Sequence, residues 1–450
     1  MEKTKKLHQL AIPILIESLL FMLLGVADIF MLSQYDDMAA GAVGAANQLI
    51  GNMHIIFAIV STGTAVLVAQ NVGARRFKDV EKVASVSLLL NFFLGLIISL
   101  TMIFFGNSIL AKMGVTDALM THASGYLLIV GGALFFQAIL NTVTAIIRSY
   151  GHTRQTMYIT VLMNIINIVG DALLIFGLFG FPEMGVMGAA IATAFSKIVA
   201  TIVALIFLFK KILPLKMFLS LKEKPVNELK RLIKIGFPSA MESMCYTLSQ
   251  TAIMSIILIY LGDNAYIART YVMTIARFVM IFFNSIGQAS QIMIGQLVGA
   301  GKVEKAYHVG LQNFKIAMFL TVLASSGMAI FSRNLIRIFT DDPVIIKIAI
   351  PVMLIDALLE AGRAFNVVWI SNLRGAGDVI FPVLMAMFSM WLFGVLGGYI
   401  FGIVLGYGLV GIWLGNLIDE WLRGISMLFR WRRKKWAEKF MLANIKSSKN

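Results

Sequence analysis

The stretch LAIPILIESLLFMLLGVADIFMLS, residues 10–33, is mostly apolar, and its only charged side chains are Glu17 and Asp28. A helix needs about 20 mostly apolar residues to cross the hydrocarbon core of a bilayer, so this stretch predicts a spanning helix. Lysines stand before it, as they do before a signal peptide, but the run is too long and no small-residue cleavage site follows. We therefore expect a permanent first span.

The whole chain has the composition of a membrane protein. Of its 450 residues 59% are hydrophobic and 14% are charged, whereas soluble domains are about 45–50% apolar and about a quarter charged. The length criterion places spans at residues 10–33, 44–70, 84–106, 123–147, 156–180, 185–209, 232–261, 270–298, 311–332, 344–371, 379–405 and 408–430. We therefore predict an all-α membrane protein of twelve transmembrane helices.

Lysine and arginine are concentrated in clusters in alternate loops and give the chain a net charge of +15. Such clusters are typical of cytoplasmic loops, whereas a nucleic-acid-binding protein carries basic residues along one polar face. The clusters are Lys3, Lys5 and Lys6; Arg75, Arg76, Lys78 and Lys82; Arg148 and Arg154; Lys210, Lys211, Lys216, Lys222, Lys224, Lys230, Arg231 and Lys234; and Arg430, Arg432, Arg433, Lys434 and Lys435. We therefore expect no nucleic-acid partner, a bacterial inner-membrane location and both termini in the cytoplasm. The clusters either contact anionic membrane lipid or serve orientation alone.

The sequence on the two sides of the basic central loop repeats in one order and at nearly one separation. The matching positions are Pro13 and Pro238, Glu17 and Glu242, QNVGA at 70–74 and QLVGA at 296–300, Asn141 and Asn366, Arg148 and Arg374, Gly151 and Gly377, and GVMG at 185–188 and GLVG at 408–411. We predict an N-lobe at 1–209, a basic cytoplasmic linker at 210–231, a C-lobe at 232–430 and a basic cytoplasmic tail at 431–450. Six spans in each half make the repeat parallel, as is common in transporters with the substrate path between the repeats.

Ionisable residues inside spans are candidates for function, because a charge at the bilayer centre costs about 2.5–3.5 kcal/mol. Glu17 and Asp28 lie on one face of the first span, about 20° apart at 100° per residue. Asn164, Asn167 and Asp171 are spaced i, i+3 and i+7 on one face of the fifth span. Such a patch suits Na⁺, or a proton held by a carboxylate. The alternative is simple hydrogen bonding between helices.

The second half carries embedded charges of both signs. Asp356, Glu360 and Arg363 are spaced i, i+4 and i+7, so they form either an internal salt bridge or a substrate contact. Glu242 in the seventh span is either a binding residue for a cationic substrate or a helix-packing residue. Lys197 in the sixth span is expected to pair with an acid on a neighbouring helix.

Motifs for ATP hydrolysis and for common hydrolytic enzymes do not occur, since the chain has no Walker loop, HExxH, GxSxG or CxxC. We therefore expect no enzyme and no cofactor, and transport driven by an ion gradient or by the substrate's own gradient. Cys245 is the one cysteine and lies in an apolar run, which predicts a packed, inert thiol.

Several short motifs occur together. They are Pro13 with ADIFM at 27–31, QNVGA at 70–74, NIVGD at 167–171 with IFG at 175–177, GAAIAT at 188–193 and LRGAGD at 373–378. Over residues 7–430 the chain thereby resembles the multidrug and toxic compound extrusion (MATE) transporters, of bacterial NorM-like type. The resemblance implies a V-shaped pair of six-helix lobes with a central cleft, and efflux of amphipathic, mostly cationic compounds in exchange for Na⁺ or H⁺. It also implies a cation site at Asp28, Asn167, Asp171 and Thr193.

The chain departs from the family's pattern in ways that bear on function. Arg363 stands where NorM-like members often carry an aspartate, so we expect ion coupling in the N-lobe. Ala172 replaces the proline that usually follows Asp171, which predicts a straighter fifth helix. A flippase for lipid-linked precursors is the alternative function, but it should place several basic residues in its cavity, and the embedded charges here are mostly acidic. We expect a monomer.

Overall fold

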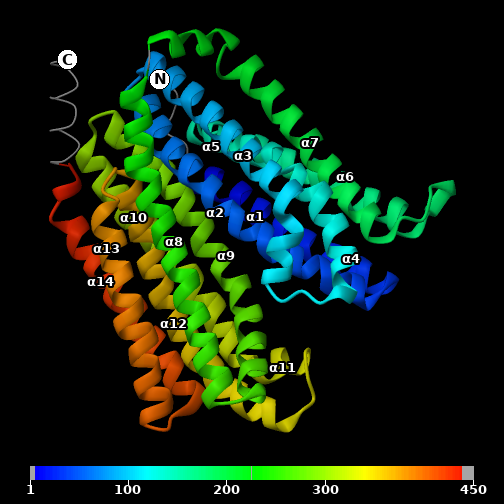
Figure 1. Ribbon diagram of the computed structural model, residues 1–450. Helices are drawn as coiled ribbons and strands as arrows, with labels where there is room; N and C mark the ends of the chain where they lie inside the picture. The colour runs from blue at the N-terminus through cyan, green and yellow to red at the C-terminus, as the bar shows by residue number, and fades with distance from the viewer. Residues whose placement is uncertain (1–5, 224, 438–450) are drawn as a thin grey trace. The chain divides into compact units, whose positions relative to one another are not determined.

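The computed structural model describes residues 6–223 and 225–437, and every regular element in these residues is a helix (Figure 1). Lys3, Lys5, Lys224 and the tail from residue 438 lie outside the described residues. The first half contains α1 (Leu7–Tyr35), α2 (Asp37–Gly73), α3 (Phe77–Lys112), α4 (Asp117–Tyr126), η1 (Leu127–Gly131), α5 (Leu134–Ser149), α6 (Thr153–Phe176), η2 (Leu178–Gly180), α7 (Gly185–Lys211) and η3 (Leu215–Glu223). The second contains α8 (Val226–Tyr260), α9 (Asp263–Gly299), α10 (Val303–Ile330), α11 (Ser332–Arg337), α12 (Pro343–Gly375), α13 (Ile380–Ser389), η4 (Met390–Gly397), η5 (Ile400–Val404) and α14 (Gly408–Arg432). The predicted all-α fold is confirmed.

The helices have the length and composition of membrane spans. Within residues 6–223 and 225–437, nine helices are long and apolar enough to cross a membrane, and α4 and α5 form a tenth span that bends by 46°. α12 and α14 coincide with the two remaining predicted spans, and they carry charged side chains that are buried inside the protein. The chain is therefore a multi-pass membrane protein.

Local backbone chemistry sets several helix features. α6 ends at Phe176, and not at residue 180 as predicted, because Gly177 takes a left-handed conformation with φ of 65°. α6 runs without a break through Ala172, as expected where no proline interrupts the hydrogen bonding. Pro13 and Pro238 lie inside α1 and α8 at equivalent positions of the repeat, and each removes one backbone hydrogen bond.

The helices pack into two units, of which the N-unit comprises Ile12–Phe237. Its apolar core forms where α2, α4, α5 and α7 meet around buried residues such as Phe57 and Tyr126. α6 and α7 approach closely because small residues face each other: a Cβ added to Gly170 would lie 2.8 Å from the Ala192 Cβ. This close approach places the polar side chains of α6 next to those of α7.

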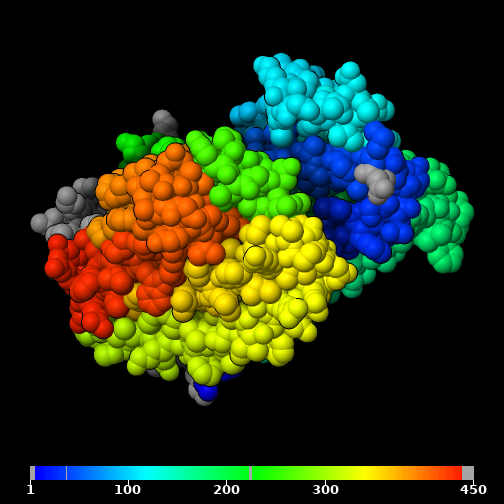
Figure 2. Space-filling model, turned by 90° about the horizontal axis from the view of Figure 1, so that it is seen from below, coloured from blue at the N-terminus to red at the C-terminus, as the bar shows by residue number. Residues whose placement is uncertain are grey.

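The C-unit begins at Pro238, and the first residues of α1, up to Ala11, group with it. Its core includes the Trp369 and Trp431 rings of α12 and α14, which are 5.6 Å apart. In Figure 2 the orange residues of segment 390–404 lie beside the green end of α8, where the Tyr260 and Tyr399 rings are 5.6 Å apart. Cys245 is buried in an apolar cluster, which confirms the predicted packed thiol.

Candidate cation-coupling site

Three helices of the N-unit bring together the four residues that the motifs indicated. Asp28 comes from α1, Asn167 and Asp171 from α6, and Thr193 from α7, and all four are buried. The Asn167 side-chain amide donates to the Thr193 hydroxyl over 3.3 Å. The carboxyl groups of Asp28 and Asp171 lie within hydrogen-bonding range of each other. The spacing pattern and the structure therefore agree on one polar centre.

This centre has more acceptor oxygens than donors. Asp28 Oδ1, Asn167 Oδ1 and both carboxylate oxygens of Asp171 are buried, and none receives a hydrogen bond from the described residues when both acids are ionised. Two adjacent carboxylates in a buried site repel each other strongly, so the pair needs a shared proton or a bound cation. No group of three or more His, Cys, Asp or Glu in the described part of the chain is arranged to hold a metal ion. A cation here would also be held by the neutral oxygens of Asn167 and Thr193.

Polar contacts follow α1 and α6 along their shared face. Near the start of both helices, Glu17 accepts hydrogen bonds from Thr156 and Thr160 at 3.1 and 3.4 Å. One turn further on, the Asn164 side chain donates to the Leu20 carbonyl over 2.8 Å. Asp28 and Asp171 follow near the other end. Residue numbers rise together on the two helices, so α1 and α6 run parallel, with the carboxyl pair at the far end of a polar seam.

Sequence reasoning missed one residue of the site, Tyr126 of α4. Its hydroxyl is hydrogen-bonded to Thr193 and donates to Asn47 Oδ1 over 3.3 Å. Nothing in the apolar run around Tyr126 indicated this role, because the contact depends on how α4 packs against α7. Lys197 of α7 is half-buried and interacts electrostatically with Asp28, in line with its expected pairing with an acid on another helix.

The two halves share an ion pair at repeat-equivalent positions. In the N-unit, Arg148 Nη2 donates to Glu17 Oε1 over 2.6 Å. In the C-unit, Arg374 Nη2 donates to Glu242 Oε2 over 3.1 Å. The repeat predicted that Glu17 corresponds to Glu242 and Arg148 to Arg374. It did not predict that the glutamate and the arginine of each half form an ion pair. Each pair joins the first helix of its half to the end of a helix more than a hundred residues later.

The embedded charges of the C-unit form one network between α12 and α14. Glu360 and Arg363 are ion-paired, as in the first of the two alternatives that their spacing left open. Asp356 accepts a hydrogen bond from the Trp413 ring over 2.8 Å. Arg363 also forms an ion pair with Glu420 of α14, with 3.5 Å between nitrogen and oxygen. On α14 itself, Arg423 forms ion pairs with Asp419 at 2.7 Å and with Glu420 at 2.8 Å. Sequence analysis overlooked the three residues of α14, although their i, i+3 and i+4 spacing signalled an intrahelical pair.

The C-unit does not repeat the carboxyl site. By the alignment of the two halves, the counterparts of Asp28, Asn167 and Asp171 are, in that order, Ile253, Phe393 and Gly397. The counterparts of Thr160 and Asn164 are Ala386 and Met390, which pack with Cys245 in an apolar cluster. The polar positions that follow Glu17 along the seam of the N-unit therefore have apolar counterparts in the C-unit.

Comparisons with known proteins agree with this architecture. The sequence matches the MatE family twice, over residues 13–173 and 238–400, once in each half. It is 42% identical to "Uncharacterized transporter YisQ" of Bacillus subtilis, over 98% of this chain and 96% of that protein. It is 30% identical to "Probable multidrug resistance protein NorM" of Thermotoga maritima, over 98% of this chain and 95% of that one. A solved structure described as the outward-facing conformation of a multidrug resistance MATE family transporter of the MOP superfamily superposes with a TM-score of 0.86, at 23% identity and over 96% of both chains.

A polytopic helical protein with an internal repeat and an oxygen-lined site buried in one half falls in the class of membrane transporters. The chain belongs to the MatE family, and within it to the bacterial NorM-like transporters.

Proposed function

We propose that this transporter is a secondary active antiporter that exports amphipathic, mostly cationic compounds in exchange for H⁺ or Na⁺, with Asp28 and Asp171 as the coupling carboxylates. The observation that carries the proposal is the buried pair of adjacent carboxyl groups with unfilled acceptor oxygens. Asn167, Thr193 and Tyr126 supply the neutral part of the site. The name of the Thermotoga maritima relative supports multidrug export.

Ion coupling in the N-unit follows from the chemistry of this pair. When the site holds a proton or Na⁺, the repulsion between Asp28 and Asp171 is relieved and α1 stays against α6. When the ion leaves, two adjacent negative charges favour separation of the helices or attract another cation. The state of the protein that binds the coupling ion therefore binds the cationic substrate poorly, as an antiporter requires. By linkage, binding of the substrate weakens binding of the ion by the same factor.

The acids of the C-unit are less suited to this role. Glu242 is paired with Arg374, and Glu360 with Arg363, so each acid is already compensated by a cation. The same pairing argues against the flippase alternative, because Arg363, Arg374 and Arg423 of the C-unit are each ion-paired with an acid and so are not free to bind a pyrophosphate. We further propose that the chain acts as a monomer in the inner membrane with both termini in the cytoplasm.

The proposal is tested by dye efflux from proteoliposomes under pH and Na⁺ gradients imposed separately. Asp28→Asn keeps the size of the side chain, so the protein should reach the membrane while gradient-driven efflux falls to background. Asp171→Asn should do similar damage. Glu17→Gln, on the same face of α1 but outside the carboxyl pair, should lower gradient-driven efflux less than Asp28→Asn does, because it breaks the ion pair with Arg148 and leaves both coupling carboxylates in place. Gradient-driven efflux by normally inserted Asp28→Asn would overturn the assignment.

A further inference from the structure

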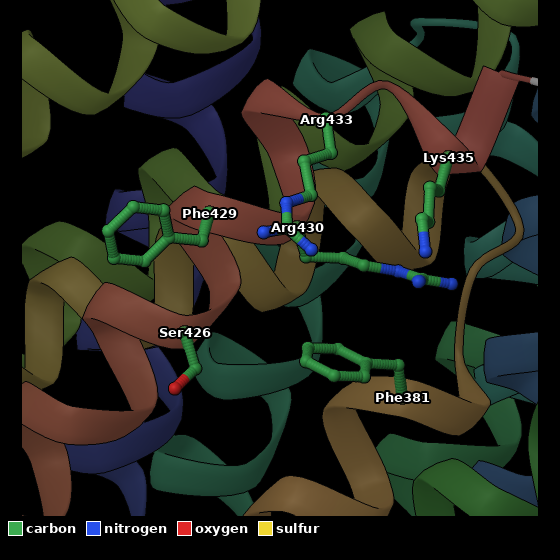
Figure 3. A pocket seen from close by; sticks show the side chains of 6 residues that line it. All are labelled: Phe381, Ser426, Phe429, Arg430, Arg433 and Lys435. Atoms are coloured by element: carbon green, nitrogen blue, oxygen red, sulfur yellow. The ribbon is translucent and has the colours of Figure 1, made fainter.

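A pocket of about 470 Å³ lies in the C-unit, where the start of α13 and the end of α14 meet. Its lining residues are Phe381, Ser426, Phe429, Arg430, Arg433 and Lys435 (Figure 3). Three of them are cations and none is an acid. Figure 3 shows the Arg430 side chain extending over Phe381 towards Lys435, so two positive groups reach the same space.

Arg430 is held in place by its surroundings. Its Nε donates to Asp378 Oδ2 over 2.7 Å, and Asp378 is buried. Its guanidinium also lies over the Phe381 ring, 4.9 Å from the centroid. A guanidinium fixed by an ion pair and a cation–π contact is pre-organised, so it loses little conformational freedom when it binds an anion. Arg433 and Lys435 are exposed, and neither forms an ion pair with another of the described residues, so both add positive charge at the rim.

The repeat shows that the fold does not require charge at this place. The alignment of Gly151 with Gly377 makes His152 the counterpart of Asp378. The alignment of α7 with α14 makes Phe207 the counterpart of Arg430. In the N-unit these counterparts form a ring contact, with centroids 5.9 Å apart. The same junction is thus held by two rings in one half and by an ion pair beside a basic pocket in the other.

The position of the pocket indicates the ligand. Arg430 is in the last turn of the spanning helix α14, next to Phe429, which is 58% exposed on the apolar surface. Basic residues at the end of a span lie at the level of the lipid phosphates, and aromatic residues there border the acyl chains. We propose that this pocket binds the phosphate of an anionic phospholipid, with Arg430, Arg433 and Lys435 on the headgroup and Phe381 and Phe429 along the first part of the chains. A membrane-bound phosphate fits better than a free one, because the pocket opens beside the apolar surface of α14.

The site is tested by native mass spectrometry of the detergent-purified full chain, titrated with phosphatidylglycerol or with phosphatidylcholine. The test variant is Arg433→Gln with Lys435→Gln, which leaves the ion pair of Arg430 intact. The matched control is Lys210→Gln with Lys211→Gln, which removes the same charge from exposed positions at the end of the repeat-related helix α7. Each lysine or arginine near anionic lipid contributes about fivefold in affinity. We expect selective phosphatidylglycerol binding that weakens at least about tenfold in the test variant and stays unchanged in the control.

Three results would overturn the proposal. If both double variants lost the same affinity for phosphatidylglycerol, the anionic lipid would be attracted diffusely to a positively charged protein and not bound in this pocket. Equal binding of the two lipids would mean that the headgroup charge is not recognised. If millimolar inorganic phosphate displaced phosphatidylglycerol, and phosphate alone stabilised the protein as much as the lipid does, the pocket would be a free-phosphate site instead of a lipid site. The carboxyl site proposed for ion coupling lies in the N-unit, so these outcomes are independent of the proposed antiport.

Discussion

At the scale of single residues, Arg363 compensates the charge of buried acids in the C-unit. It contacts Glu360 on its own helix and Glu420 on α14, and all three are buried. Removing one member of a buried ion pair costs about 3–5 kcal/mol, because the partner charge is left uncompensated. The energetic consequence therefore depends on which member is removed.

We predict that Arg363→Met destabilises the protein more than Glu360→Gln. The first leaves two buried acids without this cation, whereas after the second Arg363 still contacts Glu420. The double variant Glu360→Gln with Arg363→Met should lose less free energy of unfolding than the two single variants lose together, by about 1–3 kcal/mol. These losses are measured by thermal unfolding of the detergent-purified unchanged protein, the two single variants and the double variant. Strictly additive losses would show that the two side chains do not compensate each other.

At the scale of elements, the contact between α6 and α7 sets the geometry of the carboxyl site. A Cβ on Gly188 would overlap the Leu174 carbonyl of α6, and Gly170 faces Ala192 at close range. Small residues at such a crossing let the two backbones approach and bring Asn167 within reach of Thr193. The glycines in the GAAIAT and NIVGD motifs thus position the site without contacting an ion.

We predict that Gly188→Val destabilises the protein by about 1–3 kcal/mol, because the added methyl groups force α6 and α7 apart. Gradient-driven efflux should fall as well, since Thr193 moves away from Asn167. Gly25→Ala on α1 is the control: nothing lies within 4 Å of its Cβ position, and alanine favours the helix by about 0.5–1 kcal/mol. Unfolding temperatures and efflux are measured for both. Normal stability of Gly188→Val would contradict the close-packing account.

At the scale of the whole molecule, the basic clusters predict orientation. The buried Cys245 is the one cysteine of the chain, so Cys245→Ala gives a background without thiols. We predict that single cysteines in place of Lys210 and Arg433 react with an impermeant maleimide only after cells are opened. Cysteines in place of Lys112 and Asp341 should react in intact cells, because alternate loops face opposite sides. Labelling from one side at all four exposed positions would refute the twelve-span topology.

Much of this protein could be predicted from sequence, because the deciding signals are local. Apolar run length located the spans, and the internal repeat located the two halves, in which the MatE family also matches twice. Helical spacing placed Asn164, Asn167 and Asp171 on one face before the structure gave their partners. The expected rotation relating the halves, the cleft between them and the limits of the linker stay predictions.

The sequence by itself determined the all-helical membrane fold, the repeat and the candidate carboxylates, because length, hydropathy and residue spacing act within one helix. Only the tertiary structure decided which side chains meet across helices. It placed Asp28 against Asp171, brought Tyr126 to Thr193, paired Glu242 with Arg374 and joined α14 to the charges of α12. These contacts depend on how helices far apart in the chain approach and rotate, and the pattern along a single helix carries no information about its neighbour's rotation.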